Sequence, residues 1–92
     1  MKFDIIPADE NKPIESIEVD GSVNVELKAL QGAVGGYIQI VPVTIDGSAR
    51  QLIVDEEGLL KGAPVNTRVN SQIYEAVQIV GDAVLITEGE LQ

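Results

Sequence analysis

Residues 37–45 form the strongest strand signal in the chain and constrain its fold more than any other stretch. They are apolar at positions that face both sides of an extended chain, which is typical of a central strand with two buried faces. Pro42 conflicts with a central position, because proline cannot donate a hydrogen bond to a neighbouring strand. We therefore expect either a bulge at Pro42 or a strand that is central in its first half and edge-like in its second.

Two hairpins are predicted from turn signals between strand patterns. The Asp-Gly pair at 46–47 is a tight-turn signal, so residues 51–54 are expected to return as the antiparallel partner of that strand. Nearer the N-terminus, residues 2–7 are typical of a strand, and residues 14–19 alternate imperfectly between apolar and polar. The polar stretch between them ends in Pro13, which predicts a turn and a second hairpin.

A first helix is predicted over residues 25–34, where Asn24 provides a capping side chain. Its apolar stripe has the i, i+3, i+7 spacing of one helical face and consists of Leu27, Leu30 and Val34. Gly35 and Gly36 follow, and a glycine ends a helix readily because it can adopt a positive φ.

A second helix, over residues 67–77, is predicted from an apolar stripe with i, i+4, i+8 spacing and from Asn66 as its cap. Residues 82–87 predict a final strand, and the polar residues 88–92 are expected to form a frayed tail. The chain is then one domain, residues 1–92, of the α+β class. We expect a mostly antiparallel sheet of about five strands with two short helices packed on one face.

The residue types that are missing restrict the chemistry of the chain, which contains no Cys and no His. Without Cys there is no disulfide, thiol nucleophile or thiolate metal site. Without His the chain lacks the side chain best suited to proton transfer near neutral pH. We therefore expect no catalytic residues, no metal site and no cofactor, and a function that depends on binding rather than on catalysis.

An excess of acidic side chains restricts the partners. The chain has 15 Asp and Glu against 6 Lys and Arg, a net charge of −9, and its basic residues are spread along the sequence. Binding to nucleic acid or to an anionic membrane requires clustered cations, so neither is expected. No apolar run is long enough for a signal peptide or a membrane helix, and we expect a cytoplasmic protein.

Three acids beside a predicted turn, Asp55, Glu56 and Glu57, form one candidate site. Hard cations such as Mg²⁺ and Ca²⁺ bind several carboxylate oxygens, but these acids lack the alternating spacing of a calcium loop. A solvated turn is the alternative interpretation. We predict that the acids contact a basic partner protein rather than a metal.

A second candidate site is the irregular stretch that contains Lys61, Asn66 and Arg68. Two cations, with the free N–H groups beside a capping Asn, can hold an anionic group such as a nucleotide phosphate. Tyr37 or Tyr74 can stack on the base. The alternatives are a capping Asn with two solvated cations, and Tyr rings in the core with their hydroxyls at the surface.

Two stretches carry a resemblance to a known family. Residues 34–38 read Val-Gly-Gly-Tyr-Ile, and residues 56–66 read Glu-Glu-Gly-Leu-Leu-Lys-Gly-Ala-Pro-Val-Asn. The chain resembles an uncharacterised family of small domains of unknown function encoded by phages, plasmids and other mobile elements, although Asp55 stands where members commonly carry Asn. The resemblance implies a mobile-element origin, and the cytoplasm of the host cell as the location, but no activity.

These observations predict a non-enzymatic accessory protein that binds a protein of the host or of the element, for example to counter a host defence system. Two alternatives are open. One is a homo-oligomeric sponge that sequesters a nucleotide signal with Lys61, Asn66, Arg68 and a Tyr. The other is an acidic mimic of DNA, which the net charge of −9 favours but the lack of long rows of regularly spaced acids does not.

Overall fold

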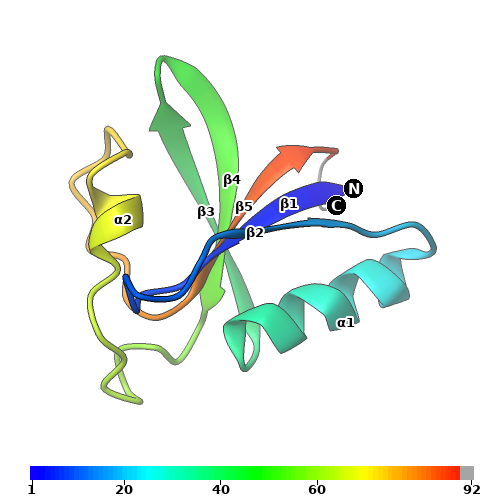
Figure 1. Cartoon of the computed structure of the whole chain (residues 1–92), viewed down its shortest axis with the longest axis horizontal. Coiled ribbons are helices and arrows are strands. Elements are labelled where there is room, and N and C mark those ends of the chain that lie inside the picture. Colours follow the sequence, from blue (N-terminus) through cyan, green and yellow to red (C-terminus); the bar gives the residue numbers. More distant parts are fainter. Residues whose placement is uncertain (90–92) are drawn as a thin grey trace.

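The computed structural model describes residues 1–89 as one antiparallel sheet with a helix on each of its faces (Figure 1). The elements follow one another as β1 (Lys2–Ile6), β2 (Glu15–Glu18), α1 (Val23–Val34), β3 (Ile38–Ile45), β4 (Ser48–Asp55), α2 (Thr67–Asn70) and β5 (Ala83–Glu88). The sheet has 5 strands in the order β2-β1-β5-β4-β3, and every pairing is antiparallel. The predicted α+β class and the predicted sheet are therefore confirmed. No helix in this part of the chain is long and apolar enough to span a membrane.

β5 joins the two predicted hairpins into one sheet. It pairs with β1 of the N-terminal hairpin on one side and with β4 of the second hairpin on the other. Figure 1 shows this strand, in red, between the two. Three of its residues are buried, because both faces and both edges of the strand are covered: Ala83, Val84 and Ile86. The C-terminal strand is therefore the centre of the sheet.

The last residue of β5, Glu88, pairs with Lys2 of β1. Their side chains also form an ion pair, with 3.2 Å between the Lys2 ammonium and the Glu88 carboxylate. The frayed tail predicted from residue 88 therefore does not begin there. The rest of that prediction, at residues 90–92, lies outside the described residues.

β3 is an edge strand along its whole length, which resolves the conflict at Pro42. The Tyr37 carbonyl accepts a hydrogen bond from Glu56 N–H, so odd-numbered residues direct their backbone groups toward β4. Even-numbered residues direct theirs to the free edge, where Thr44 N–H donates to the Glu75 carboxylate at 2.7 Å. Pro42 belongs to this second set, so its missing N–H removes no bond between the strands. The register with β4 continues through Pro42 without the expected bulge.

The turn predicted at Asp46 and Gly47 is confirmed. Both residues have a positive φ, 51° for Asp46 and 78° for Gly47. This is the type I′ geometry, whose twist matches that of the flanking strands. Pairing starts directly after the turn, so β4 begins at Ser48, earlier than predicted.

α1 begins two residues before the predicted start. Its cap is Ser22, whose hydroxyl accepts a hydrogen bond from Val25 N–H at 3.4 Å, and Asn24 lies within the helix. Ser22 has the extended backbone of a capping residue, with φ −74° and ψ 166°. The predicted end is confirmed, because Gly35 follows the helix with a φ of 82°.

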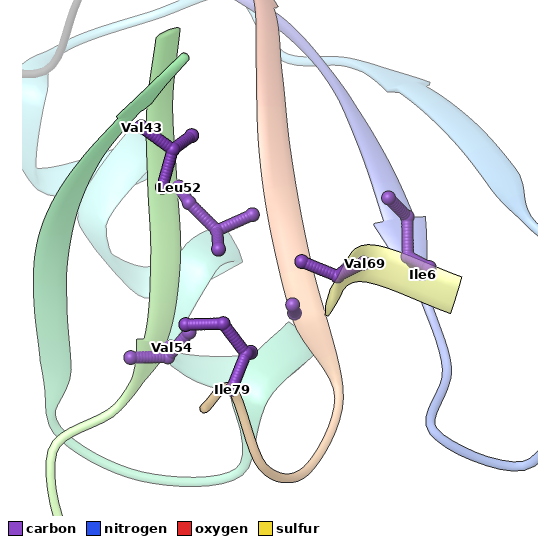
Figure 2. Packing of buried hydrophobic residues seen from close by; sticks show 7 residues of the cluster. Ile6, Val43, Leu52, Val54, Val69 and Ile79 are labelled. Carbon is purple, nitrogen blue, oxygen red and sulfur yellow. The ribbon is translucent and has the colours of Figure 1, made fainter. Parts of the chain in front are cut away.

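The two faces of the sheet carry separate cores. α1 contributes Leu30 and Val34 to a cluster with Ile53 of β4 and Val84 of β5. The other face carries the cluster drawn in Figure 2, to which α2 contributes Val69. The remaining members of this second cluster are Ile6, Val43, Leu52, Val54, Ile79 and Ala83.

The prediction that both helices pack on one face is therefore wrong. Adjacent residues of a strand point to opposite faces of the sheet. Leu52, Ile53 and Val54 are consecutive in β4 and all three are buried. Both faces of the sheet need a cover, and one helix lies on each.

α2 is capped by Asn66 as predicted, but it ends at Asn70 rather than at residue 77. The chain then runs to the free edge of the sheet, where Tyr74 N–H donates to the Thr44 carbonyl at 2.9 Å. A continued helix would use Tyr74 N–H internally, four residues back along the chain. Contact with a distant strand therefore replaces the last turns of the predicted helix.

Candidate functional site

The turn after β4, residues 55–62, is held by a dense set of hydrogen bonds, and we refer to it as the 55–62 turn. The Asp55 carboxylate accepts a bond from Glu57 N–H at 2.9 Å and lies 2.7 Å from the Lys61 ammonium. The backbone N–H of Lys61 donates to the Glu57 carbonyl at 3.0 Å, and that of Gly62 donates to the Leu59 carbonyl at 3.1 Å. The backbone of the turn is therefore ordered by its own contacts.

The Asp55–Lys61 ion pair also ties the turn to the end of α1. Lys61 donates to the Gly35 carbonyl at 3.3 Å, where the helix end carries partial negative charge. A Cβ atom at Gly36 would lie 2.8 Å from the Lys61 ammonium and 3.0 Å from an Asp55 oxygen. Glycine at position 36 therefore allows the ion pair to lie directly against the backbone.

This ion pair changes the titration of both groups. The hydrogen bond from the Lys61 ammonium, together with the one from Glu57 N–H, lowers the pKa of Asp55 below its ordinary value. The same hydrogen bond to Asp55 raises the pKa of Lys61. Asp55 and Lys61 therefore hold the turn in place, and their charges largely neutralise each other.

The turn displays two large apolar side chains to solvent. Leu59 is 75% exposed and Leu60 is 89% exposed. The exposed acids Glu56 and Glu57 lie on the same turn. Gly58 lies close to Val80, because a Cβ atom at position 58 would be only 3.1 Å from a methyl group of Val80. Apolar and acidic groups are thus presented together on a turn whose backbone is hydrogen-bonded.

Tyr37 lies beside the turn and is 68% exposed. A hollow of about 290 Å³ is lined by Gln31, Gly36, Tyr37, Glu57 and Lys61. The structure therefore brings together two residues of the predicted ligand site, Tyr37 and Lys61, with Glu57 of the predicted partner site. The exposure of Leu59 and Leu60 was not among our predictions. The sequence signal for it is a pair of leucines between two glycines in a polar turn.

Asn66 is fully buried, which is not compatible with a role in ligand binding. Its amide donates to the Ile6 carbonyl at 2.8 Å and to the Gly81 carbonyl at 2.9 Å. Its side-chain oxygen accepts a bond from Val69 N–H at 3.2 Å. The capping interpretation is the one observed, and the same side chain also joins α2 to the end of β1 and to the segment just before β5.

Arg68 also has a structural role in place of the predicted one. Its guanidinium donates to the carbonyl of Asp9 at 3.1 Å and to that of Lys12 at 2.6 Å, both in the turn between β1 and β2. Lys61, in contrast, binds Asp55 and Gly35. The predicted anion pocket of Lys61, Asn66 and Arg68 is therefore not assembled, because each side chain serves a different contact.

Tyr74 lies at a separate place, near the hairpin of β3 and β4. It lines a hollow with Thr44, Asp46 and Gly47, among others. Tyr74 is 87% exposed and Tyr37 is 68% exposed, so neither residue places a ring in the core, as the alternative interpretation expected.

Within residues 1–89, no group of three or more acidic side chains is placed so that it could hold a metal ion. Of the three acids predicted as one site, Asp55 is turned inward to Lys61, whereas Glu56 and Glu57 face solvent. Around the 55–62 turn, the side chains exposed for contact with a partner include Glu56, Glu57, Leu59, Leu60 and Tyr37.

Comparison with known proteins gives a family and no activity. A family model described as domain of unknown function (DUF3846) matches residues 1–91 of the chain. Searches of the curated proteins and of the solved structures found no significant match.

Proposed function

The chain belongs to the DUF3846 family of domains of unknown function, and from its surfaces we propose that it is a non-enzymatic accessory protein that binds another protein. We further propose that it is encoded by a phage or mobile element, and that its target belongs to the host or to the element. Interference with a host defence system is the use that we propose for such binding.

One observation carries this proposal: Leu59 and Leu60 are 75% and 89% exposed on a turn that is otherwise rigidly held. Exposed apolar side chains that lie together, with polar groups around them, mark surfaces where proteins associate. A surface that is already ordered loses little conformational entropy on binding. The 55–62 turn has both properties.

The charges beside the leucines favour a partner with a basic surface. Glu56 and Glu57 precede the apolar pair on the same turn, and the whole chain has a net charge of −9. A complementary surface has an apolar pocket with Lys or Arg at its rim. Association with such a surface is accelerated by charge and slows as salt increases.

The two alternatives have less support. A nucleotide sponge requires the pocket of Lys61, Asn66 and Arg68, but Asn66 is buried and Arg68 binds two backbone carbonyls. A DNA mimic requires free, regularly spaced carboxylates, but the acids of Asp55 and Glu75 are bound within the fold.

The test compares two matched double variants as bait in a lysate of the organism that carries the gene. Leu59→Ser with Leu60→Ser removes the apolar pair, whereas Val23→Ser with Val25→Ser removes two exposed side chains of α1. We expect the wild type and the α1 variant to capture the same protein, and the turn variant to bind it at least about a hundredfold more weakly, since burial of two leucines contributes about 3 kcal/mol or more and about 1.4 kcal/mol is a factor of ten.

Capture should decrease as salt is raised from about 0.05 M to 0.5 M, because the surface charges are screened. Equal capture by both double variants would show that the turn is not the binding surface. Turnover of any substrate by the purified protein, abolished by a single substitution, would contradict the non-enzymatic part of the proposal.

A further inference from the structure

The free edge of β3 is only half covered by the chain itself. Even-numbered residues of β3 direct their N–H and C=O groups away from β4, as the bonds of Thr44 show. At Thr44 both groups are used, by the Glu75 carboxylate and by Tyr74 N–H. No backbone hydrogen bond within residues 1–89 reaches the outward groups of Ile38 and Ile40.

We propose that this open half of the edge, residues 38–42, pairs with an extended segment of the partner protein in which apolar and basic side chains alternate. The proposal rests on the proposed function and adds the manner in which the partner binds. An unpaired strand edge offers a row of donors and acceptors that an extended peptide completes as an additional strand.

The apolar half of the expected pattern follows from the α1 face of the sheet. Ile40 is 41% exposed and pairs with Ile53, whose side chain belongs to the α1 core. A hollow of about 360 Å³ on this face is lined by the apolar residues Ile40, Pro42 and Ile86, together with polar residues that include Arg50. Every second side chain of an added strand would point to this face, where an apolar group can enter the hollow.

The basic side chains of the expected partner segment are inferred from the opposite face of the sheet. There Gln39, Val41 and Glu56 line a second hollow, of about 210 Å³, beneath the 55–62 turn. Alternate side chains of the added strand would point toward this face, where Glu56 is exposed. Lys or Arg at those positions would meet an opposite charge.

A second copy of the chain fits this edge less well than a basic partner. It would bring another net charge of −9, and its own 55–62 turn, to the same edge. The other edge of the sheet, β2, is also a poorer site. It is only 4 residues long, and its sequence Glu-Ser-Ile-Glu has one apolar side chain. Short, charged strands of this kind discourage pairing.

The probe for the test is a capped synthetic peptide, Lys-Ile-Lys-Val-Lys-Ile, titrated into the ¹⁵N-labelled protein while amide hydrogen exchange is measured. At saturation we expect the Ile38 and Ile40 amides to exchange about tenfold more slowly, because both become hydrogen-bonded. Two control peptides should have no effect: one with N-methyl groups on alternate amides, and one with Glu in place of Lys.

A matched pair of variants separates backbone pairing from side-chain contact. Ile40→Pro removes the outward N–H, and Pro42 shows that this strand accepts proline at a position of the same orientation. Ile40→Ala removes a comparable part of the side chain and keeps the N–H. We expect the proline variant to weaken peptide binding at least tenfold more than the alanine variant, with the fold of both checked by their amide spectra.

Three outcomes would overturn the proposal: no binding of the peptide, binding that slows exchange at β2 or at the 55–62 turn instead, and equal loss of binding in the two variants. Protection of Ile38 and Ile40 that depends on protein concentration, without peptide, would assign the edge to a second copy. Failure of the proposed function is distinguishable, because the lysate capture depends on Leu59 and Leu60 and not on the peptide.

Discussion

Asn66 shows how a single buried polar side chain can join segments that are far apart in the sequence. It is fully buried, and its amide group contacts the carbonyls of Ile6 and Gly81 while its oxygen caps α2 at Val69. Two donors and one acceptor are thereby satisfied by partners that lie up to 60 residues away in the sequence. Removal of such a group leaves buried partners without hydrogen bonds, which costs more than the bonds themselves contribute.

We predict that Asn66→Ala lowers the free energy of unfolding by about 3 kcal/mol, the combined effect of a lost cap and of two carbonyls left unpaired, one buried and one partly buried. Asn66→Asp should be still less stable, since a buried carboxylate would face those two carbonyl oxygens. Urea denaturation measures both. Asn24→Ala, at an exposed position in α1, is the control and should change stability by less than about 0.5 kcal/mol. An aspartate variant as stable as the wild type would contradict this account.

At the scale of the elements, the most informative contact is the one that ends α2 early. Glu75 accepts hydrogen bonds from Thr44 N–H at 2.7 Å and from the Thr44 hydroxyl at 2.8 Å. The bond from the backbone N–H is the main cause that lowers the pKa of Glu75 below its ordinary value of 4.5. The segment after α2 therefore covers one half of the β3 edge. The strength of its hydrogen bonds to Thr44 depends on the charge of Glu75.

A carboxyl group whose pKa is lower in the folded protein than in the unfolded chain stabilises the fold when the pH is above the unfolded-state pKa. This stabilisation is lost as the pH falls through the folded-state pKa. We predict that the protection factor of the Thr44 amide decreases on acidification below pH 4.5, the ordinary pKa of Glu75. Glu75→Gln, which can accept the same bond without a charge, should give weaker protection that is independent of pH in this range. Hydrogen exchange followed by NMR tests this, and an identical pH dependence in wild type and variant would refute it.

For the whole molecule, the dominant electrostatic property is the net charge of −9 within 32 × 31 × 23 Å. The screening length is about 30 Å at 0.01 M salt and about 8 Å at 0.15 M. At low salt every charge therefore interacts with nearly every other, and at 0.15 M only with its neighbours. The ion pair Lys2–Glu88 lies at the surface, where such a pair contributes little, and in the pair Lys61–Asp55 only the Lys61 side chain is well exposed to solvent.

We therefore predict that the free energy of unfolding increases between about 0.01 M and 0.15 M NaCl, by about 1 kcal/mol or less, because screening of the repulsion outweighs screening of the ion pairs. Thermal and urea denaturation at pH 7 measure the change. Choline chloride at equal ionic strength is the control, and it should have the same effect if screening is the cause. A decrease in stability with NaCl would mean that the ion pairs dominate.

Local signals in the sequence were sufficient for several features of the fold and for part of the site. Gly35 and the Asp46–Gly47 turn have positive φ values, and these residue types adopt a positive φ at low energetic cost. The capping role of Asn66 and the exposure of Glu56 and Glu57 also follow from residue type and near neighbours. The exposed leucines of the 55–62 turn had a weaker signal, since a Leu pair is as typical of a core.

The sequence by itself thus determined the α+β class, the two hairpins and the acidic turn, because these depend on contacts between near neighbours. Only the tertiary structure decided that β5 lies at the centre, that β3 is an edge and that α2 covers the second face. It also committed Asn66 and Arg68 to structural bonds. These features arise from pairing between segments far apart in the chain, and such pairing leaves no periodic pattern in either segment alone.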